Sequence, residues 1–403
     1  MTPETRLKPG RDLRVIISGA SCISLMMLTV GCTLATIQAG TPVQTGFERQ
    51  VFTIDFGDFQ TRAELTVPRS GAAPLPTVIL IPGSGPEDMD ATISGFDMLG
   101  KPAKLSNIFR DISDSVTPSG FAVLRYNKHY VMGPGQFDAQ KYYTKVDMQQ
   151  MLEDAENVLE AARANPRVDA KRIYLYGWSE GSSVAAALVA RHPELAGLIV
   201  QGPLALSWRE TFLFQIREVG MPYLRSFAAD GRVTDATLPR MQSGAGGGVA
   251  KSILNYIGDP VAFQKGKVAI NPLLDTNKDG ALDLETELTP KILEGMVDAG
   301  FTSFFGLYAP GRALPTLLEA VPKLKLPVLI LQGQFDSNVP EQGARALGAA
   351  LKAAGNTDVT LKVYEGLGHS LGYSSSLIDD NFRPIVGAPL TDLVSWLRAH
   401  TGN

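Results

Sequence analysis

One serine of this chain stands where it could act as a nucleophile. Ser179 lies in the run GWSEG (residues 177–181), between a strand-like run at 172–176 and a helix-like run at 182–191. A serine hydroxyl is a weak nucleophile at neutral pH and needs a base within hydrogen-bond reach. Glycine on both sides permits the tight turn that exposes such a serine at the carboxyl edge of a sheet. We therefore predict a catalytic Ser179; the alternative is a structural turn around a buried serine.

The base is expected to be one of the four histidines. His369 lies in GLGHS (366–370), a flexible loop just after the strand-like run at 359–364. A base on such a loop can reach Ser179 across adjacent strand ends. The other three histidines are weaker candidates. His129 precedes the nucleophile, His192 ends a helix and His400 lies at the chain end.

The acid that orients the base should follow the preceding strand. Asp336 falls on the loop after the strand-like run that ends at residue 333. Its predicted role is to fix the tautomer of His369 and to stabilise the imidazolium. The alternative is an N-cap for the helix that starts near Pro340, but Asp336 is too early for that position.

The oxyanion that forms during acyl transfer needs two hydrogen-bond donors. The backbone N–H of Glu180, directly after the nucleophile, is one candidate. The second should come from PGSGP (82–86), the loop after the strand-like run TVILIP, and by position it is the N–H of Ser84. The alternative for this loop is a simple Gly/Pro turn that ends a strand.

The elements that must carry these residues alternate between continuous apolar strands and amphipathic helices. A hairpin is expected at 50–67, and the later expected elements follow in order: strand 77–82, helix 102–115, strand 121–126, helix 147–164, strand 172–176, helix 182–191, strand 196–201, strand 327–331, helix 341–354, strand 359–364 and helix 390–400. Strands that are apolar on both faces indicate a mostly parallel central sheet flanked by helices, an α/β fold. Residues 202–322 break this alternation and look helical, with the glycine run 244–248 as a flexible break.

These patterns predict four parts along the chain. They are a signal or lipoprotein segment at 1–40, a first part of the core at 46–203, an inserted helical cap at 204–322 and a second part of the core at 323–403.

Three motifs together resemble a known family. They are IPGSGPED (81–88), VLRYNK (123–128) and GWSEG (177–181). They resemble bacterial esterases of the α/β-hydrolase superfamily that carry a Gly-Ser-Gly-Pro oxyanion loop, similar to the serine aminopeptidase and dienelactone hydrolase-like groups. The resemblance spans roughly residues 50–203 and 324–402, and implies the α/β-hydrolase fold and carboxylesterase activity. The order nucleophile, acid, base also matches that superfamily.

A second motif lies in the predicted cap. Residues 275–283 (DTNKDGALD) resemble an EF-hand calcium loop, with oxygen ligands at alternate positions and glycine at the sixth. The predicted ligands of a structural Ca²⁺ are Asp275, Asn277, Asp279, the Ala281 carbonyl and Asp283. The twelfth position holds Thr286 in place of the usual glutamate. The alternative is a solvated acidic turn.

The N-terminus and the composition bear on location and partners. A positive start and an apolar run at 15–30 have the layout of a secretory signal. The run LTVGC that ends at Cys32 resembles a lipobox, which predicts a lipidated, membrane-anchored protein; simple secretion to the periplasm is the alternative. The net charge of −4 in 403 residues offers no basic surface for nucleic acid. Both cysteines lie in this segment, so no disulfide is expected in the mature domain.

The sequence thus predicts an exported serine hydrolase that cleaves a small ester through an acyl-enzyme, with no cofactor in catalysis. An aminopeptidase or amidase with the same three residues is the first alternative. A surface lipoprotein that binds a ligand without catalysis is the second.

Overall fold

The computed structural model describes residues 46–69, 74–96, 102–228, 230–303 and 306–401. The predicted signal segment and the lipidated Cys32 lie outside these residues, so export and anchoring stay predictions. Among the helices that the structure does describe, none combines the length and the apolar character needed to cross a bilayer.

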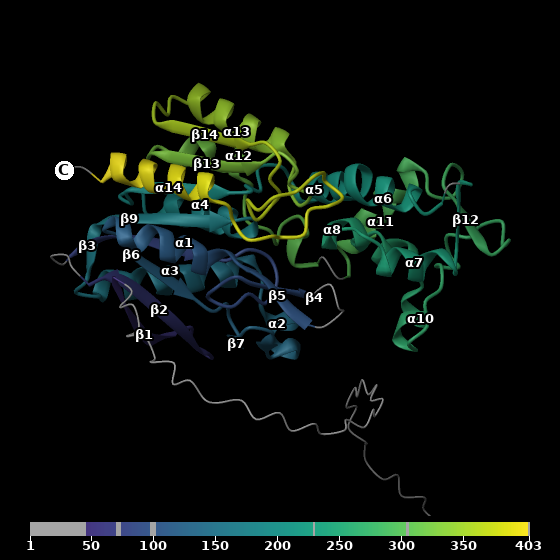
Figure 1. Cartoon of the computed structure of the whole chain (residues 1–403), viewed down its shortest axis with the longest axis horizontal. Coiled ribbons are helices and arrows are strands. Elements are labelled where there is room, and N and C mark those ends of the chain that lie inside the picture. The colour runs from purple at the N-terminus through teal and green to yellow at the C-terminus, as the bar shows by residue number, and fades with distance from the viewer. Residues whose placement is uncertain (1–45, 70–73, 97–101, 229, 304–305, 402–403) are drawn as a thin grey trace, which may run out of the picture. The chain divides into compact units, whose positions relative to one another are not determined.

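The core is built on an eight-stranded sheet with the order β1-β2-β6-β3-β9-β10-β13-β14 (Figure 1). The strands are β1 Phe47–Asp55, β2 Gln60–Pro68, β3 Leu75–Ile81, β6 Ala122–Tyr126, β9 Val168–Trp178, β10 Gly197–Gln201, β13 Val328–Gly333 and β14 Val359–Tyr364. β1 and β2 form the predicted hairpin, and β2 runs antiparallel to β6. All pairings from β6 to β14 are parallel, so their carboxyl ends meet at one edge. The mostly parallel sheet is confirmed.

Helices cover both faces of the sheet because its central strands are apolar on both sides. In β3, Ile79 and Ile81 belong to one buried cluster while Val78 and Leu80 belong to the other. The first cluster also holds apolar residues of α3 (Met148–Ala164), α4 (Glu180–Arg191) and α13 (Glu341–Ala353). The second holds those of α1 (Ile108–Val116) and α14 (Gly387–His400).

The chain between β10 and β13 adds no strand to this sheet in its described part. Figure 1 shows most of it as a separate group of green elements beside the core. Its elements are α5 Trp208–Phe214, the π-helical turn η2 Gln215–Gly220, α6 Met221–Arg225, β11 Arg232–Thr234, α7 Thr237–Ser243, α8 Gly248–Ser252, α9 Leu254–Ile257, α10 Pro260–Gln264, β12 Ala281–Asp283, α11 Pro290–Gly300, η3 Gly306–Tyr308, α12 Leu317–Ala320 and η4 Val321–Lys323. The segment is mainly helical, as expected, but β11 and β12 form a short antiparallel pair.

The helix expected at 102–115 begins later than the sequence suggested. Residues Pro102–Asn107 form strand β5, which pairs with β4 (Thr92–Phe96). The helical pattern of buried apolar residues starts only at Ile108, where α1 begins. Other short elements nearby are η1 Thr117–Ser119, β7 Val131–Gly133, β8 Gln136–Phe137 and α2 Ala139–Lys145.

The glycine run is closely packed at residues 244–247, in contrast to the flexible break expected at 244–248 from its composition. A Cβ on Gly247 would lie 2.0 Å from the carbonyl oxygen of Asp380, and one on Gly246 would lie 2.6 Å from the ring of Tyr223. The N–H of Gly247 also donates to the carbonyl of Ile378 at 2.7 Å. Gly247 therefore lets the inserted segment approach the loop that follows β14, and Gly246 lets the run pack against Tyr223.

Candidate active site

Ser179 occupies a strained turn between β9 and α4. Its φ of 54° lies in the left-handed region, which costs free energy for any residue except glycine. A Cβ on Gly177 would lie 2.5 Å from the carbonyl oxygen of Gly181, and one on Gly181 would lie 2.3 Å from that of Ile81. Only glycine fits at these two positions, so the sequence spacing and the turn geometry agree.

The predicted base and acid are hydrogen-bonded to each other. The Nδ1 of His369 lies 2.7 Å from Oδ2 of Asp336, and both side chains are at most 2% exposed. The other carboxylate oxygen of Asp336 accepts the N–H groups of Asn338 and Val339, both at 2.9 Å. Asp336 therefore has a fixed orientation, in which one oxygen faces the imidazole.

Ser179 and His369 are both hydrogen-bonded to Gln201, the last residue of β10. The N–H of Ser179 donates to the carbonyl of Gln201 at 2.9 Å, and the side-chain amide of Gln201 donates to the carbonyl of His369 at 2.9 Å. A Cβ on Gly202 would lie 2.7 Å from Nδ1 of His369, so this position must stay without a side chain. The ring of Trp178 is 5.5 Å from that of His369 between centroids.

The hydroxyl of Ser179 makes no hydrogen bond to any residue that the structure describes. Nδ1 of His369 is taken by Asp336, which leaves Nε2 as the nitrogen for the nucleophile. In enzymes without substrate, the distance between the nucleophile hydroxyl and the base nitrogen is often long, and it shortens in the reacting complex. The structure thus brings base and acid together, and Ser179 follows β9, which β10 separates from the strand that precedes the acid.

One predicted oxyanion donor follows Ser179 directly, and the other follows Gly83, which packs against Ser179. A Cβ on Gly83 would lie 3.3 Å from the Cβ of Ser179, so the loop after β3 packs directly against this serine. Neither the N–H of Ser84 nor that of Glu180 donates to another described residue. Neither donor is therefore engaged by a described residue, as an oxyanion donor requires.

The remaining histidines have structural partners. His192 hydrogen-bonds Glu156 and lies 3.1 Å from Glu194, and His400 lies 3.1 Å from both carboxylate oxygens of Asp358. These contacts sit at helix ends away from Ser179, as their sequence positions suggested.

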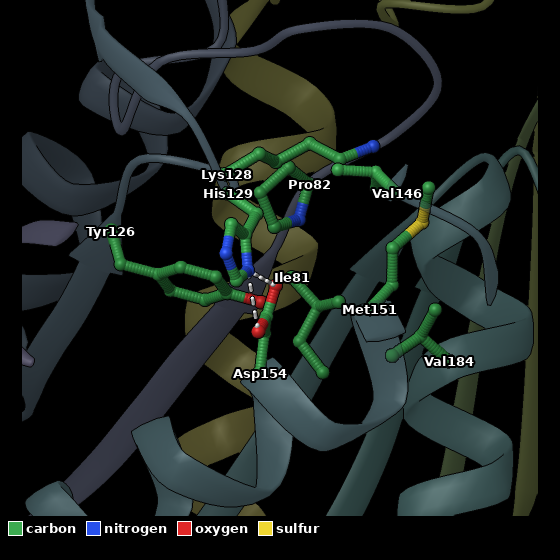
Figure 2. A pocket seen from close by; sticks show the side chains of 9 residues that line it. All are labelled: Ile81, Pro82, Tyr126, Lys128, His129, Val146, Met151, Asp154 and Val184. Carbon is green, nitrogen blue, oxygen red and sulfur yellow. Dashed lines mark hydrogen bonds and ion pairs between the residues drawn. The ribbon is translucent and has the colours of Figure 1, made fainter. Parts of the chain in front are cut away.

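His129 is buried between two carboxylates behind the oxyanion loop. Its Nδ1 lies 3.0 Å from Asp154, its Nε2 lies 3.0 Å from Asp58, and the side chain is 2% exposed. Burial lowers the pKa of His129, but the hydrogen bonds and charges of Asp154 and Asp58 outweigh this and raise it. Figure 2 shows His129 and Asp154 at a cavity of about 10 Å³, which is the size of one water and too small for a substrate.

Asp380 is a buried carboxylate of this site that sequence reasoning missed. It is 1% exposed, and its Oδ2 accepts the N–H of His369 and both the N–H and the hydroxyl of Ser337, each at 3.0 Å. It therefore joins the loop of the predicted base to the loop of the predicted acid, Asp336. Asp380 stands in an irregular stretch with no periodicity, so no sequence signal singled it out.

The pH profile should report the charges around His369. Burial lowers its pKa, but the charge and hydrogen bond of Asp336 and the charge of Asp380 outweigh this and raise it above the ordinary 6.5. A base must be neutral, so kcat/KM is expected to fall as the pH drops through this raised pKa. Replacing Asp380 with Asn removes one charge and should move the midpoint to lower pH. An unchanged acidic limb in a folded Asp380→Asn variant would contradict this.

Comparison with known proteins decides the family. A family model described as serine aminopeptidase, S33, matches residues 103–264 and 296–373, more than half of the chain. The chain belongs to this family. It is therefore a hydrolase of the α/β-hydrolase superfamily, and the resemblance seen in the three motifs is confirmed.

The individual proteins that the chain resembles are at most 30% identical to it over the matched residues. Esterase EstD of Thermotoga maritima is 30% identical over 176 residues, which are 43% of this chain and 36% of that protein. The match thus spans little more than a third of that relative. A putative dienelactone hydrolase from Klebsiella pneumoniae has a TM-score of 0.45 at 13% identity, covering 87% of this chain and 98% of the other. A hypothetical protein from Pseudomonas aeruginosa has a TM-score of 0.48 at 14% identity, covering 89% and 96%.

The oxygen atoms of the predicted calcium loop are largely engaged within the loop itself. Asp275 accepts the N–H of Gly280 at 3.0 Å, and Asn277 accepts that of Asp279 at 2.9 Å. Arg232 pairs with Asp279 at 2.8 Å. Across the described residues, no three or more His, Cys, Asp or Glu side chains are grouped so as to hold a metal ion. The donors as placed do not form a cation site, and calcium binding stays a prediction.

Glu287 closes the same loop from one residue beyond the twelfth position. Its carboxylate accepts the N–H of Thr276 at 2.6 Å and that of Asp283 at 3.0 Å, and the side chain is 5% exposed. The carboxylate of Asp283 accepts the N–H of Thr286 at 2.8 Å. These bonds stabilise the turn.

Thermal unfolding tests the calcium prediction. Calcium at about ten times its Kd should add about 1.4 kcal/mol and raise Tm by a few degrees, because it would bind only the folded loop. Asp275→Asn should abolish that shift, since it removes a charged ligand at the first position. Equal Tm values in calcium and in chelator would show that the loop needs no metal.

Proposed function

We propose that this chain is a serine hydrolase that cleaves carboxylic esters through an acyl-enzyme on Ser179. The observation that carries the proposal is the buried 2.7 Å contact between His369 and Asp336 beside the strained turn of Ser179. The free N–H groups of Ser84 and Glu180 supply the matching oxyanion donors. These are the roles that acyl transfer requires.

In the proposed acylation, Nε2 of His369 takes the proton of the Ser179 hydroxyl as its Oγ bonds to the ester carbonyl carbon. The carbonyl oxygen becomes an oxyanion, which accepts hydrogen bonds from Ser84 and Glu180. The bond to the alcohol then breaks, and the alcohol leaves with the proton held by His369. Asp336 keeps the proton on Nδ1 throughout and stabilises the imidazolium.

Deacylation repeats these steps with water. His369 takes a proton from water as the water oxygen bonds to the acyl carbon. The second oxyanion accepts hydrogen bonds from the same two N–H groups. The bond to Oγ breaks, Ser179 regains its proton from His369 and the carboxylic acid leaves. No cofactor takes part in this scheme.

Esters are favoured over aminoacyl amides for two reasons. The relative from Thermotoga maritima is named an esterase. An aminopeptidase also needs an acidic group for the substrate's free amine. Glu180, the carboxylate next to Ser179, is fully buried and paired with Lys128 at 2.9 Å, so its charge is already neutralised.

A substrate panel tests the proposal. Nitrophenyl esters of increasing acyl length are compared with aminoacyl nitroanilides at matched concentrations. We expect turnover of the esters and a higher kcat/KM for every ester than for any anilide. Preferential cleavage of the anilides would favour the aminopeptidase alternative. No turnover of either class by folded protein would favour a ligand-binding role.

A further inference from the structure

Lys128 is a buried ammonium that touches both segments carrying the predicted oxyanion donors. Its Nζ donates to the carbonyl of Gly83 at 2.7 Å and to Oε2 of Glu180 at 2.9 Å. The side chain is 5% exposed and that of Glu180 is fully buried. One cation thus connects the loop after β3 with the first residue of α4.

The contact with Gly83 fixes the direction of the first donor. In a planar trans peptide the C=O and the following N–H point to opposite sides. Because Lys128 holds the carbonyl of Gly83, the N–H of Ser84 must point away from the ammonium. The N–H of Gly83 is also held, since it donates to the Glu87 carboxylate at 2.8 Å. Gly83 is therefore held through both its N–H and its carbonyl, at a position that packs against Ser179.

The contact with Glu180 fixes the second donor. Glu180 begins α4, and its backbone N–H is the one that follows the nucleophile. Burial lowers the pKa of Lys128, but the charge of Glu180 and the groups around it outweigh this and raise the pKa above its usual value. Lys128 is therefore charged, and its ion pair holds the start of the helix in place.

The loop that carries Lys128 is itself well anchored. The N–H of Lys128 donates to the carbonyl of Glu87 at 3.1 Å, and the side chain of Asn127 accepts the N–H of Met89 at 2.8 Å. The next residue, His129, binds Asp154 (Figure 2). Lys128 thus starts from a rigid position, which is what a residue that orients other groups requires.

We propose that Lys128 is a positioning residue of the oxyanion hole, which aims the N–H of Ser84 through the Gly83 carbonyl and holds that of Glu180 through its carboxylate. The inference rests on the proposed function. The proposed role of Lys128 is to orient these two partners, because its side chain is only 5% exposed and its ammonium donates to both of them. Its effect should therefore appear in stabilisation of the oxyanion and not in substrate binding.

Lys128→Met tests the inference. Loss of one oxyanion donor typically costs about 10²- to 10³-fold in kcat, so misdirected donors should lower kcat about 10- to 100-fold, with KM almost unchanged. The affinity for a trifluoromethyl ketone, which forms an oxyanion on the nucleophile, should fall by the same factor. Lys325→Met is the matched control, because Lys325 also donates to a backbone carbonyl, that of Ala354 at 2.9 Å, but is exposed and distant from the site. The control should keep wild-type kcat.

A double variant separates positioning from folding. Lys128→Met alone leaves Glu180 as an uncompensated buried charge, which can unfold the protein. Lys128→Met/Glu180→Gln removes both charges and keeps the backbone N–H of residue 180. We expect it to regain thermal stability while kcat and the ketone affinity stay low. Wild-type kcat and ketone affinity in this folded double variant would overturn the inference. A wild-type enzyme that neither turns over esters nor binds the ketone would instead overturn the proposed function.

Discussion

Replacing Ser179 with alanine is expected to lower kcat for ester hydrolysis by about 10⁴- to 10⁶-fold, because no acyl-enzyme can form without its hydroxyl. The fold should survive, since that hydroxyl makes no hydrogen bond to a described residue and the turn depends on Gly177 and Gly181. Initial rates on a short-chain nitrophenyl ester, with circular dichroism to check folding, measure the effect.

Ser183 provides the matched control for this variant. It lies on α4, one helical turn from the nucleophile, and its buried hydroxyl has no hydrogen-bond partner in the described structure. Ser183→Ala should therefore keep nearly full activity. Comparable activity in Ser179→Ala and Ser183→Ala would show that the strained serine is not the nucleophile.

Replacing Asp336 with asparagine should lower kcat by about 10³- to 10⁴-fold. The reason lies in the orientation of this side chain. Its Oδ1 accepts two backbone N–H groups, from Asn338 and Val339, so the oxygen of an asparagine must stay on that side. The amide nitrogen would then face His369 and donate to Nδ1, which places the ring proton on Nε2. In that tautomer His369 cannot take the proton of Ser179.

The control for Asp336→Asn is the same change at Asp392. This aspartate lies on α14, is partly exposed and accepts the hydroxyl of Tyr364 at 2.9 Å. Asp392→Asn should leave kcat unchanged. If Asp336→Asn were as active as this control, the buried contact with His369 would be structural and another group would orient the base.

The elements that carry the candidate site could be predicted because their signals are local. β3 and β9 are apolar on both faces, and each is followed directly by a glycine-containing turn. The order Ser179, Asp336, His369 places each residue after a different strand, and parallel strands bring their carboxyl ends to one edge. The contact between His369 and Asp336 follows from that arrangement.

The supporting residues could not be predicted because their partners are distant in sequence. Lys128 meets Glu180 across 52 positions, and no local pattern gives that register. Asp380 follows the base in an irregular segment, where neither a helical nor a strand period identifies a buried face. The composition of the glycine run at 244–248 suggested a flexible break, but Gly247 allows close packing against Asp380.

The most direct test of the account is the site of covalent labelling. The folded protein is treated with a fluorophosphonate, digested, and the modified residue is located by peptide mass spectrometry. We expect a single phosphonyl adduct on Ser179, formed more slowly in Lys128→Met/Glu180→Gln. An adduct on another serine, or none on folded active protein, would contradict Ser179 as the nucleophile.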